Sequence, residues 1–249
     1  MKRIVIKIGT NSITNDDGTL NMPLLADIVD QIALLRKNHD VLIVTSGAVG
    51  AGKSMINILR HDEVTKRQIY AAIGQVKLMT TYSELFKKHD VFVAQMLMTK
   101  MDFVDREHYL NTKNCLESLF KEKIVPIMNE NDVVAVQELM FTDNDELAAM
   151  IAKMLSADLM IILSNVDGVY DGKKKVIPSF NYDSDAPSAI TASEKSSFGK
   201  GGMLSKFAMA KSVAENGTAV VIANSKTENV IVKITNGENM GTRFIPKKI

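Results

Sequence analysis

Short runs of β-branched and other aliphatic residues alternate along this chain with longer segments whose apolar residues recur at helical spacing. Strands that alternate with helices and are apolar throughout are typical of a mostly parallel sheet covered on both faces. The sequence therefore predicts an α/β fold. We expect strands at residues 3–8, 41–44, 91–94, 124–128, 159–163, 219–223 and near 242–245, and helices at 22–37, 62–88, 106–122, 144–156, 202–215 and near 227–235.

The composition predicts a cytoplasmic protein with a single domain over residues 1–249. A chain of 249 residues with 46% hydrophobic composition suffices for one large α/β domain or two small ones, and no repeat or low-complexity linker divides it. A net charge of +1 does not suggest a nucleic-acid partner. No apolar run approaches the roughly 18 residues of a membrane span, and we find no signal peptide. The lone Cys115 excludes an intrachain disulfide.

Four polar or glycine-rich segments follow directly after predicted strands. They are residues 9–12, 45–48, 129–132 and 164–167. In an open parallel sheet, ligands bind outside the carboxyl ends of the strands. We therefore expect these four segments to converge on one edge of the sheet and to form a ligand site there.

A glycine-rich run at residues 199–202 leads into a helical pattern, with Lys206 one turn in. Glycine lets backbone N–H groups approach an anion, and the start of a helix adds its positive dipole end. The spacing does not match the Walker A pattern, G-x-x-x-x-G-K-S/T, so a phosphate site here needs a second half elsewhere in the chain. The alternative is a glycine-rich surface loop that caps an ordinary helix.

Lys7 lies inside the first predicted strand, close to Gly9. An amine among apolar neighbours is unfavourable unless it meets an anion at the strand end. The alternative is an edge-strand lysine whose amine reaches water. Together, Lys7 and Lys206 suit phosphoryl transfer, which depends mostly on positioning and charge neutralisation.

Two segments rich in carboxylates and amides complete the predicted site. Residues 143–146 either cap a helix with acidic first-turn residues or supply a carboxylate that orients both lysines beside an amide that contacts substrate. Residues 129–132 either form an Asn/Asp turn or recognise a small zwitterion, with Asp132 accepting from its ammonium and the asparagines meeting its carboxylate. A bound Mg²⁺ would be held mainly by nucleotide phosphates, and we assign no residue as a metal ligand.

The ordered set of motifs resembles the amino acid kinase family along nearly the whole chain, and within it the branch that acts on free glutamate. The matching segments are VIKIGTNS (5–12), VTSGAV (44–49), NEND (129–132), TDND (142–145), GGMLSK (201–206) and GTRF (241–244). The resemblance implies a three-layer αβα sandwich around a mostly parallel sheet. It implies ATP-dependent phosphorylation of the side-chain carboxylate of L-glutamate, the first step of proline biosynthesis. It also implies a kinase domain alone, without the C-terminal PUA domain of many bacterial relatives.

The resemblance assigns catalytic roles to three residues. It implies that Lys7 and Lys206 neutralise the transferring phosphoryl group and that Asp145 organises the two lysines. A glutamate side chain has a pKa near 4.3 and is already an anion at pH 7. The predicted nucleophile therefore needs no general base.

The resemblance also implies binding roles. Ser46, Asp132 and Asn144 are expected to hold glutamate. The chain departs from the family pattern at Ser164-Asn165, where members often carry Thr-Asp, and at Lys200, where they often carry Thr. Nucleotide contacts are implied for Ser164, Asn165, Lys200, Gly201, Gly202, Met203, Leu204, Ser205 and Lys206.

The implied partners are ATP, L-glutamate, proline as a feedback inhibitor, glutamyl-phosphate reductase as the enzyme that receives the product, and a second or further copies of the chain in a homodimer or homotetramer. Two alternatives stay open. One is another amino acid kinase that acts on acetylglutamate or aspartate, and the other is a catalytically silent amino-acid sensor on the same fold. The polar, irregular stretch at residues 171–200 predicts a flap that closes over ATP.

Overall fold

The computed structural model describes residues 1–15, 17–134, 141, 143–187 and 202–248 of the chain. The strands are β1 (Arg3–Ile8), β2 (Asp40–Thr45), β3 (Val93–Met98), β4 (Val125–Glu130), β5 (Leu159–Ser164), β6 (Ser179–Asn181), β7 (Ala219–Asn224) and β8 (Thr242–Ile245). Across these described segments they form one eight-stranded sheet in the order β3-β4-β2-β1-β5-β7-β8-β6. Neighbouring strands pair in parallel, except that β7 and β8 are antiparallel.

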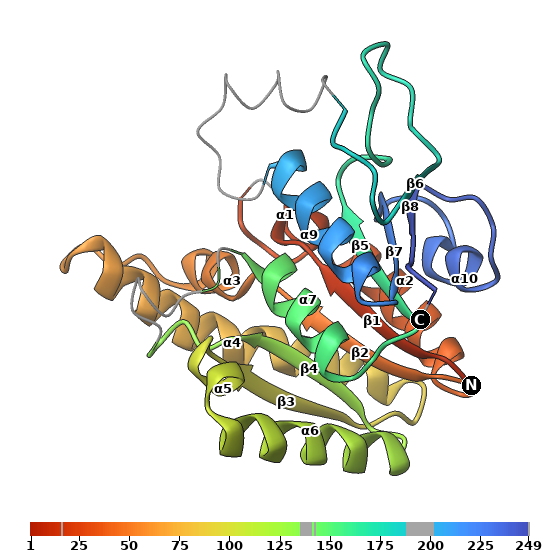
Figure 1. Cartoon of the computed structure of the whole chain (residues 1–249). Coiled ribbons are helices and arrows are strands. Elements are labelled where there is room, and N and C mark those ends of the chain that lie inside the picture. The colour runs from red at the N-terminus through yellow and green to blue at the C-terminus, as the bar shows by residue number, and fades with distance from the viewer. Residues whose placement is uncertain (16, 135–140, 142, 188–201, 249) are drawn as a thin grey trace.

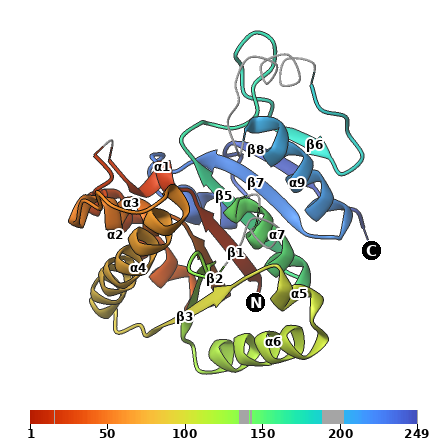
Figure 2. The same cartoon turned by 90° about the vertical axis from the view of Figure 1, so that its left-hand side faces the viewer.

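Helices cover both faces of this sheet, as Figures 1 and 2 show. They are α1 (Thr10–Ile13), α2 (Met22–Leu35), α3 (Ala48–Met55), α4 (Glu63–Lys87), α5 (Met101–Val104), α6 (Arg106–Lys121), α7 (Asn144–Met154), α9 (Met203–Glu215) and α10 (Val230–Thr235). One core lies between the sheet and α2, α4 and α10, and the other between the sheet and α6, α7 and α9. The expected three-layer αβα arrangement is confirmed. Among the described helices, none combines the length and apolar composition needed to cross a bilayer.

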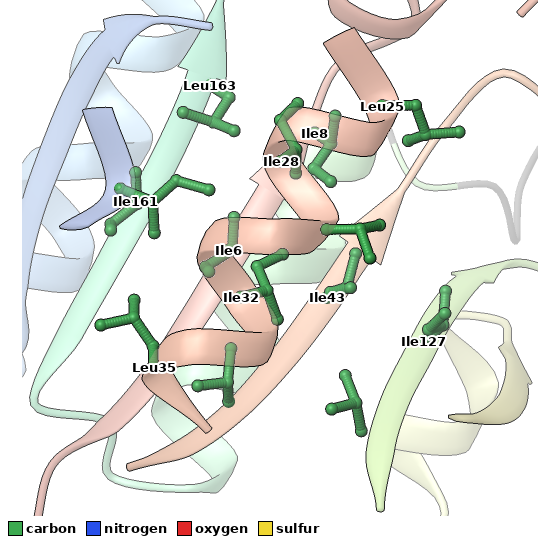
Figure 3. Close-up of a cluster of buried hydrophobic side chains, with 14 of the residues drawn as sticks. Ile6, Ile8, Leu25, Ile28, Ile32, Leu35, Ile43, Ile127, Ile161 and Leu163 are labelled. Carbon is green, nitrogen blue, oxygen red and sulfur yellow. The ribbon is translucent and has the colours of Figure 1, made fainter. Parts of the chain in front are cut away.

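The alternation of side chains along β1 serves both layers and positions the first lysine. Successive residues of a strand point to opposite faces of the sheet. Ile6 and Ile8 pack in the same core as Ile28 of α2, as the close-up in Figure 3 shows. Val5 belongs to the opposite core, which includes α7. Lys7 shares the face of Val5, so its amine is directed toward the α7 side near the carboxyl end of the strand.

Most predicted elements are confirmed, but the region after β2 differs. Helix α3 is not predicted, because its sequence holds two glycines, which are poor helix formers. One glycine of α3 and one glycine of α4 lie where these two helices touch. A Cβ on Gly52 of α3 would overlap the carbonyl of Tyr70, and a Cβ on Gly74 of α4 would overlap the carbonyl of Ala48. The glycines therefore let α3 and α4 pack backbone against backbone, a tertiary effect that helix propensity does not include.

Strands β3, β4 and β6 also depart from the sequence prediction. Strand β4 extends to Glu130, so Asn129 and Glu130 belong to the strand rather than to the turn after it. Strand β3 begins at Val93 rather than residue 91 and continues to Met98. The stretch at 171–200, expected to be irregular, contains the short strand β6, which pairs with β8 at the end of the sheet. Residues 188–200 of that stretch lie outside the described residues, so the flap stays a prediction.

Candidate active site

A cleft of about 280 Å³ lies at the carboxyl ends of β1, β2 and β5, where the sequence places its ligand site. Its lining residues come from β1 and β5, from the loops after these three strands, and from the starts of α7 and α9. Polar and charged side chains dominate the lining. It consists of Lys7, Gly9, Thr10, Asn11, Ser12, Ser46, Asp143, Asn144, Leu163, Ser164, Asn165 and Lys206.

Asp145 bridges two lysines that come from distant parts of the chain. Its Oδ1 lies 2.6 Å from Nζ of Lys7, and its Oδ2 lies 3.2 Å from Nζ of Lys206. The carboxylate is almost fully buried, and both ammonium groups are largely shielded from water. Two ammonium groups share this carboxylate, and both lysines line the cleft. Their positive charge suits an anionic ligand.

Asp143 caps helix α7 and also lines the cleft. Its Oδ1 accepts from the backbone N–H groups of Asp145 and Glu146, at 2.9 and 3.2 Å. The helix-cap interpretation of residues 143–146 is therefore correct. The carboxylate of this segment that pairs with both lysines is Asp145, and the substrate contact of the amide stays a prediction. Oδ2 of Asp143 is buried without a hydrogen-bond donor among the described residues. Burial, and next the nearby carboxylate of Asp145, raise the pKa of Asp143 above its usual value.

The amide of Asn144 joins the ends of β2 and β4 to the start of α7. Its Nδ2 lies 2.7 Å from the carbonyl oxygen of Thr45, 2.8 Å from Oγ of Ser46 and 2.9 Å from Oδ1 of Asn129. An amide nitrogen has two hydrogens, so three acceptors on this side fix the amide orientation firmly. Gly47, which follows Ser46, adopts a left-handed backbone with φ of 101° that favours glycine.

Asp132 lies away from the cleft lining, contrary to the expected convergence of all four segments. Its Oδ1 accepts from the guanidinium of Arg67 at 2.9 Å. Both Asp132 and Glu130 line a second cavity of about 150 Å³ between α4 and the ends of β3 and β4. Asn129 was expected to meet a substrate carboxylate, but it is 3% exposed and its amide is hydrogen-bonded to other side chains of the protein.

Comparison with known proteins identifies the family. The model of the amino acid kinase family matches residues 2–224. A relative named glutamate 5-kinase from Bacteroides thetaiotaomicron is 44% identical over 98% of this chain and 70% of its own length. The chain belongs to the amino acid kinase family. Other relatives with the same name come from Chlorobaculum tepidum, 46% identical over 99% of this chain and 70% of its own length, and from Alkaliphilus metalliredigens, 40% identical over 98% and 95%.

A solved structure supports the fold of this amino acid kinase. The crystal structure of UMP kinase from Ureaplasma parvum superposes with a TM-score of 0.66, at 17% identity, over 98% of this chain and 100% of that one. At this identity the likeness shows the fold alone. The α/β architecture with a mostly parallel sheet is therefore shared, while the substrate side must be argued from the residues of this chain.

The residues predicted for the nucleotide side of this kinase are only partly brought together. Ser164 and Asn165 line the same cleft as Lys206. Gly202 is the N-cap of α9, and Met203, Leu204 and Ser205 form its first turn. Lys200 and Gly201 lie outside the described residues. The role of each in binding a nucleotide stays a prediction.

Some cleft residues have no role predicted from the sequence. Residues 9–12 are expected at the site only as a segment, whereas Thr10, Asn11 and Ser12 each line the cleft together with Lys7. The signal was present, because polar residues that follow a glycine at a strand end are typical of such sites. No local sequence pattern indicates that Gln75 of α4 hydrogen-bonds Asn129. Its position emerges only from the packing of α4 beside β4.

Proposed function

We propose that this chain transfers the γ-phosphoryl group of ATP to the side-chain carboxylate of L-glutamate. The observation that carries the proposal is the pair of shielded lysines, Lys7 and Lys206, held by the single carboxylate of Asp145 at a polar cleft. The naming of relatives that are 40 to 46% identical over nearly the whole chain supports glutamate as the acceptor.

The chemistry requires two anions to meet. The glutamate carboxylate is ionised at neutral pH, so one of its oxygens attacks the γ-phosphorus without a base. A new P–O bond to the carboxylate forms, the bond between the γ-phosphorus and the bridging oxygen breaks, and ADP leaves with the electron pair. Lys7 and Lys206 lower the repulsion between the reactants and neutralise charge that builds up on the transferring group. Asp145 holds both amines in place before the reaction, which reduces the reorganisation required.

The acidic side of the cleft fits a nucleotide-bound magnesium ion. Mg²⁺ prefers oxygen ligands, and Asp143 offers a carboxylate oxygen with no donor among the described residues. Asp145 is already committed to the two lysines. We therefore propose that Mg²⁺ enters with the ATP phosphates, with Asp143 as its neighbour on the protein side. When bound, it would neutralise phosphate charge.

We propose that glutamate binds on the side of the cleft formed by Ser46 and Asn144. Because Nδ2 of Asn144 points at three protein acceptors, its Oδ1 is the amide atom suited to accept from an α-ammonium group. Asp132 is proposed to add a negative charge for the same ammonium, in competition with Arg67. Ser164, Asn165 and residues 200–206 are proposed to contact the nucleotide.

The wider context of this function is also proposed. The chain would act in the cytoplasm as a single kinase domain, as a homodimer or homotetramer, with proline as an inhibitor and glutamyl-phosphate reductase as the next enzyme. These proposals follow from family membership, and they are separable from the phosphoryl transfer itself.

A coupled assay of ADP release tests the function. The purified protein is supplied with ATP and Mg²⁺ and with glutamate, N-acetylglutamate or aspartate in turn. We expect turnover that depends on glutamate and is at least ten times slower with the other two acceptors. Faster turnover with N-acetylglutamate or aspartate would support the related kinase instead. Glutamate binding without ADP release would support the sensor.

A further inference from the structure

Gln75 lies outside the cleft lining, yet a continuous chain of hydrogen bonds connects it to the proposed glutamate site. Nδ2 of Asn129 donates to Oε1 of Gln75 at 2.9 Å. Oδ1 of Asn129 in turn accepts from Nδ2 of Asn144 at 2.9 Å. Asn144 then reaches Oγ of Ser46, which also lines the cleft. Three elements are joined in this way: α4, the end of β4 and the start of α7.

The central amide, Asn129, can take only one orientation. With its Nδ2 toward Gln75, its Oδ1 accepts both from Asn144 and from the backbone N–H of Glu130 at 2.9 Å. If the amide were flipped, its NH₂ group would face these two donors. Its oxygen would then face an acceptor, Oε1 of Gln75. Asn129 is 3% exposed, so water does not relieve such a mismatch.

The orientation of the Asn129 amide favours one orientation of the Asn144 amide. Because Oδ1 of Asn129 is available as an acceptor, the Nδ2 side of Asn144 is held against the protein. The Oδ1 side is then presented for the substrate. Without an acceptor at residue 75, Asn129 keeps its Oδ1 toward the backbone N–H of Glu130 but loses the partner of its Nδ2. Its side chain is then held less firmly, and the preference of Asn144 weakens with it.

Gln75 is an unfavourable residue for packing alone. Its Nε2 is buried and has no hydrogen-bond acceptor among the described residues. A buried donor without a partner is destabilising, so Nε2 does not explain why a glutamine occupies this position. Gln75 contributes to the site through its acceptor oxygen, Oε1, which accepts from Asn129.

We infer that Gln75 is a positioning residue for the substrate amide, acting through Asn129 to hold Oδ1 of Asn144 toward the ammonium group of glutamate. This inference rests on the proposed function. It separates two properties that a purely structural role would couple, because removal of the Gln75 acceptor weakens glutamate binding and leaves ATP binding unchanged.

Two substitutions at this position and one neighbour provide the test. Gln75→Met keeps the approximate shape and removes the acceptor, and Gln75→Glu keeps an acceptor oxygen. Val76→Ala is the matched control, because Val76 is adjacent and 69% exposed. We expect Gln75→Met to raise the glutamate KM about tenfold, the effect of roughly 1.4 kcal/mol, with an unchanged ATP KM. Its Tm should fall, because the buried Nδ2 of Asn129 loses its acceptor. Gln75→Glu should stay within about threefold of wild type, since one contact to the amide is retained.

The outcomes separate the inference from the function. If wild type phosphorylates glutamate and Gln75→Met matches Val76→Ala, the inference fails and the function stands. A fall in Tm with both KM values raised would mean a structural role and would also overturn it. If wild type does not act on glutamate, the function fails. The hydrogen-bond chain is then tested without substrate, by the NMR resonances of the side-chain NH₂ group of Asn144. These should shift in Gln75→Met and not in Val76→Ala, and equal spectra would overturn the inference.

Discussion

Each lysine of the candidate site is held by the same buried carboxylate, Asp145, although Lys7 and Lys206 come from opposite ends of the chain. We predict that Lys7→Ala or Lys206→Ala lowers kcat by about 10²–10³-fold, as expected for loss of one preorganised charge, with smaller effects on the glutamate KM. Steady-state kinetics measures both. Lys153→Ala is the control, because Lys153 lies on an exposed face and contacts Ser212. A lysine variant with near-normal kcat would remove that residue from the mechanism.

Asp132 is also tested at the level of the single residue. Its carboxylate is mostly buried and is paired with the half-exposed Arg67. We predict that Asp132→Asn, which keeps the shape and removes the charge, raises the glutamate KM at least about tenfold, the size expected for loss of a charged hydrogen bond. The ATP KM should stay the same. Arg67→Met tells whether Asp132 acts on glutamate or only on Arg67. If Arg67→Met and Asp132→Asn raise the glutamate KM equally, Asp132 acts only by holding Arg67. A change in the ATP KM would place Asp132 on the nucleotide side.

Glu130 gives a pH-dependent prediction. Burial raises the pKa of Glu130 above its usual value, although its Oε1 accepts from the N–H of Phe141. The folded protein therefore binds this proton more tightly than the unfolded chain. That contribution to stability is present below the unfolded pKa, about 4.3, and is lost as pH rises through the folded pKa.

Glu130→Gln keeps the acceptor oxygen and is neutral at every pH. We predict a higher Tm than wild type near pH 8 and a difference that shrinks toward about pH 4, where Glu130 itself becomes neutral. Thermal melts across this range measure the difference. A Tm difference that does not vary with pH would mean that the ionisation of Glu130 is not unfavourable in the folded state.

At the scale of elements, the packing of α3 against α4 carries a stability prediction. Helix propensity alone favours Gly74→Ala by about 1 kcal/mol. The added Cβ, however, would overlap the carbonyl oxygen of Ala48. Because overpacking costs about 1–3 kcal/mol or more, we predict a Tm lower by about 2–10 °C. Gly172→Ala is the matched control, since nothing lies within 4 Å of its added Cβ. Equal Tm values would show that the helices separate easily.

The elements that could be predicted are those whose sequence carries its own periodicity. Strands such as β1 and β5 are continuous apolar runs, and α7 combines an Asp143 cap with an amphipathic pattern. Helix α3 and strand β6 were missed because tertiary contacts hold them. The first depends on glycines that allow close packing, and the second on pairing with β8.

At the scale of the whole molecule, the sheet order explains how far the site could be predicted. Because β1 lies between β2 and β5, the loops that follow these three strands meet at one cleft, as their parallel arrangement predicts. The loop after β4 lies one strand further out. Asp132 there turns toward α4 instead, which local pattern could not reveal. Gln75 was hidden for the same reason, because its partner lies 54 residues away in the chain.

The most direct test of the central claim is chemical identification of the product. An acyl phosphate reacts with hydroxylamine, so the purified protein is incubated with ATP, Mg²⁺, glutamate and hydroxylamine, and the hydroxamate is identified by mass spectrometry. We predict γ-glutamyl hydroxamate only in the complete mixture, with at least about a hundredfold less formed by Lys206→Ala. ATP-dependent hydroxamate from N-acetylglutamate or aspartate but not from glutamate would contradict the account, as would the absence of any hydroxamate from a folded protein that binds glutamate.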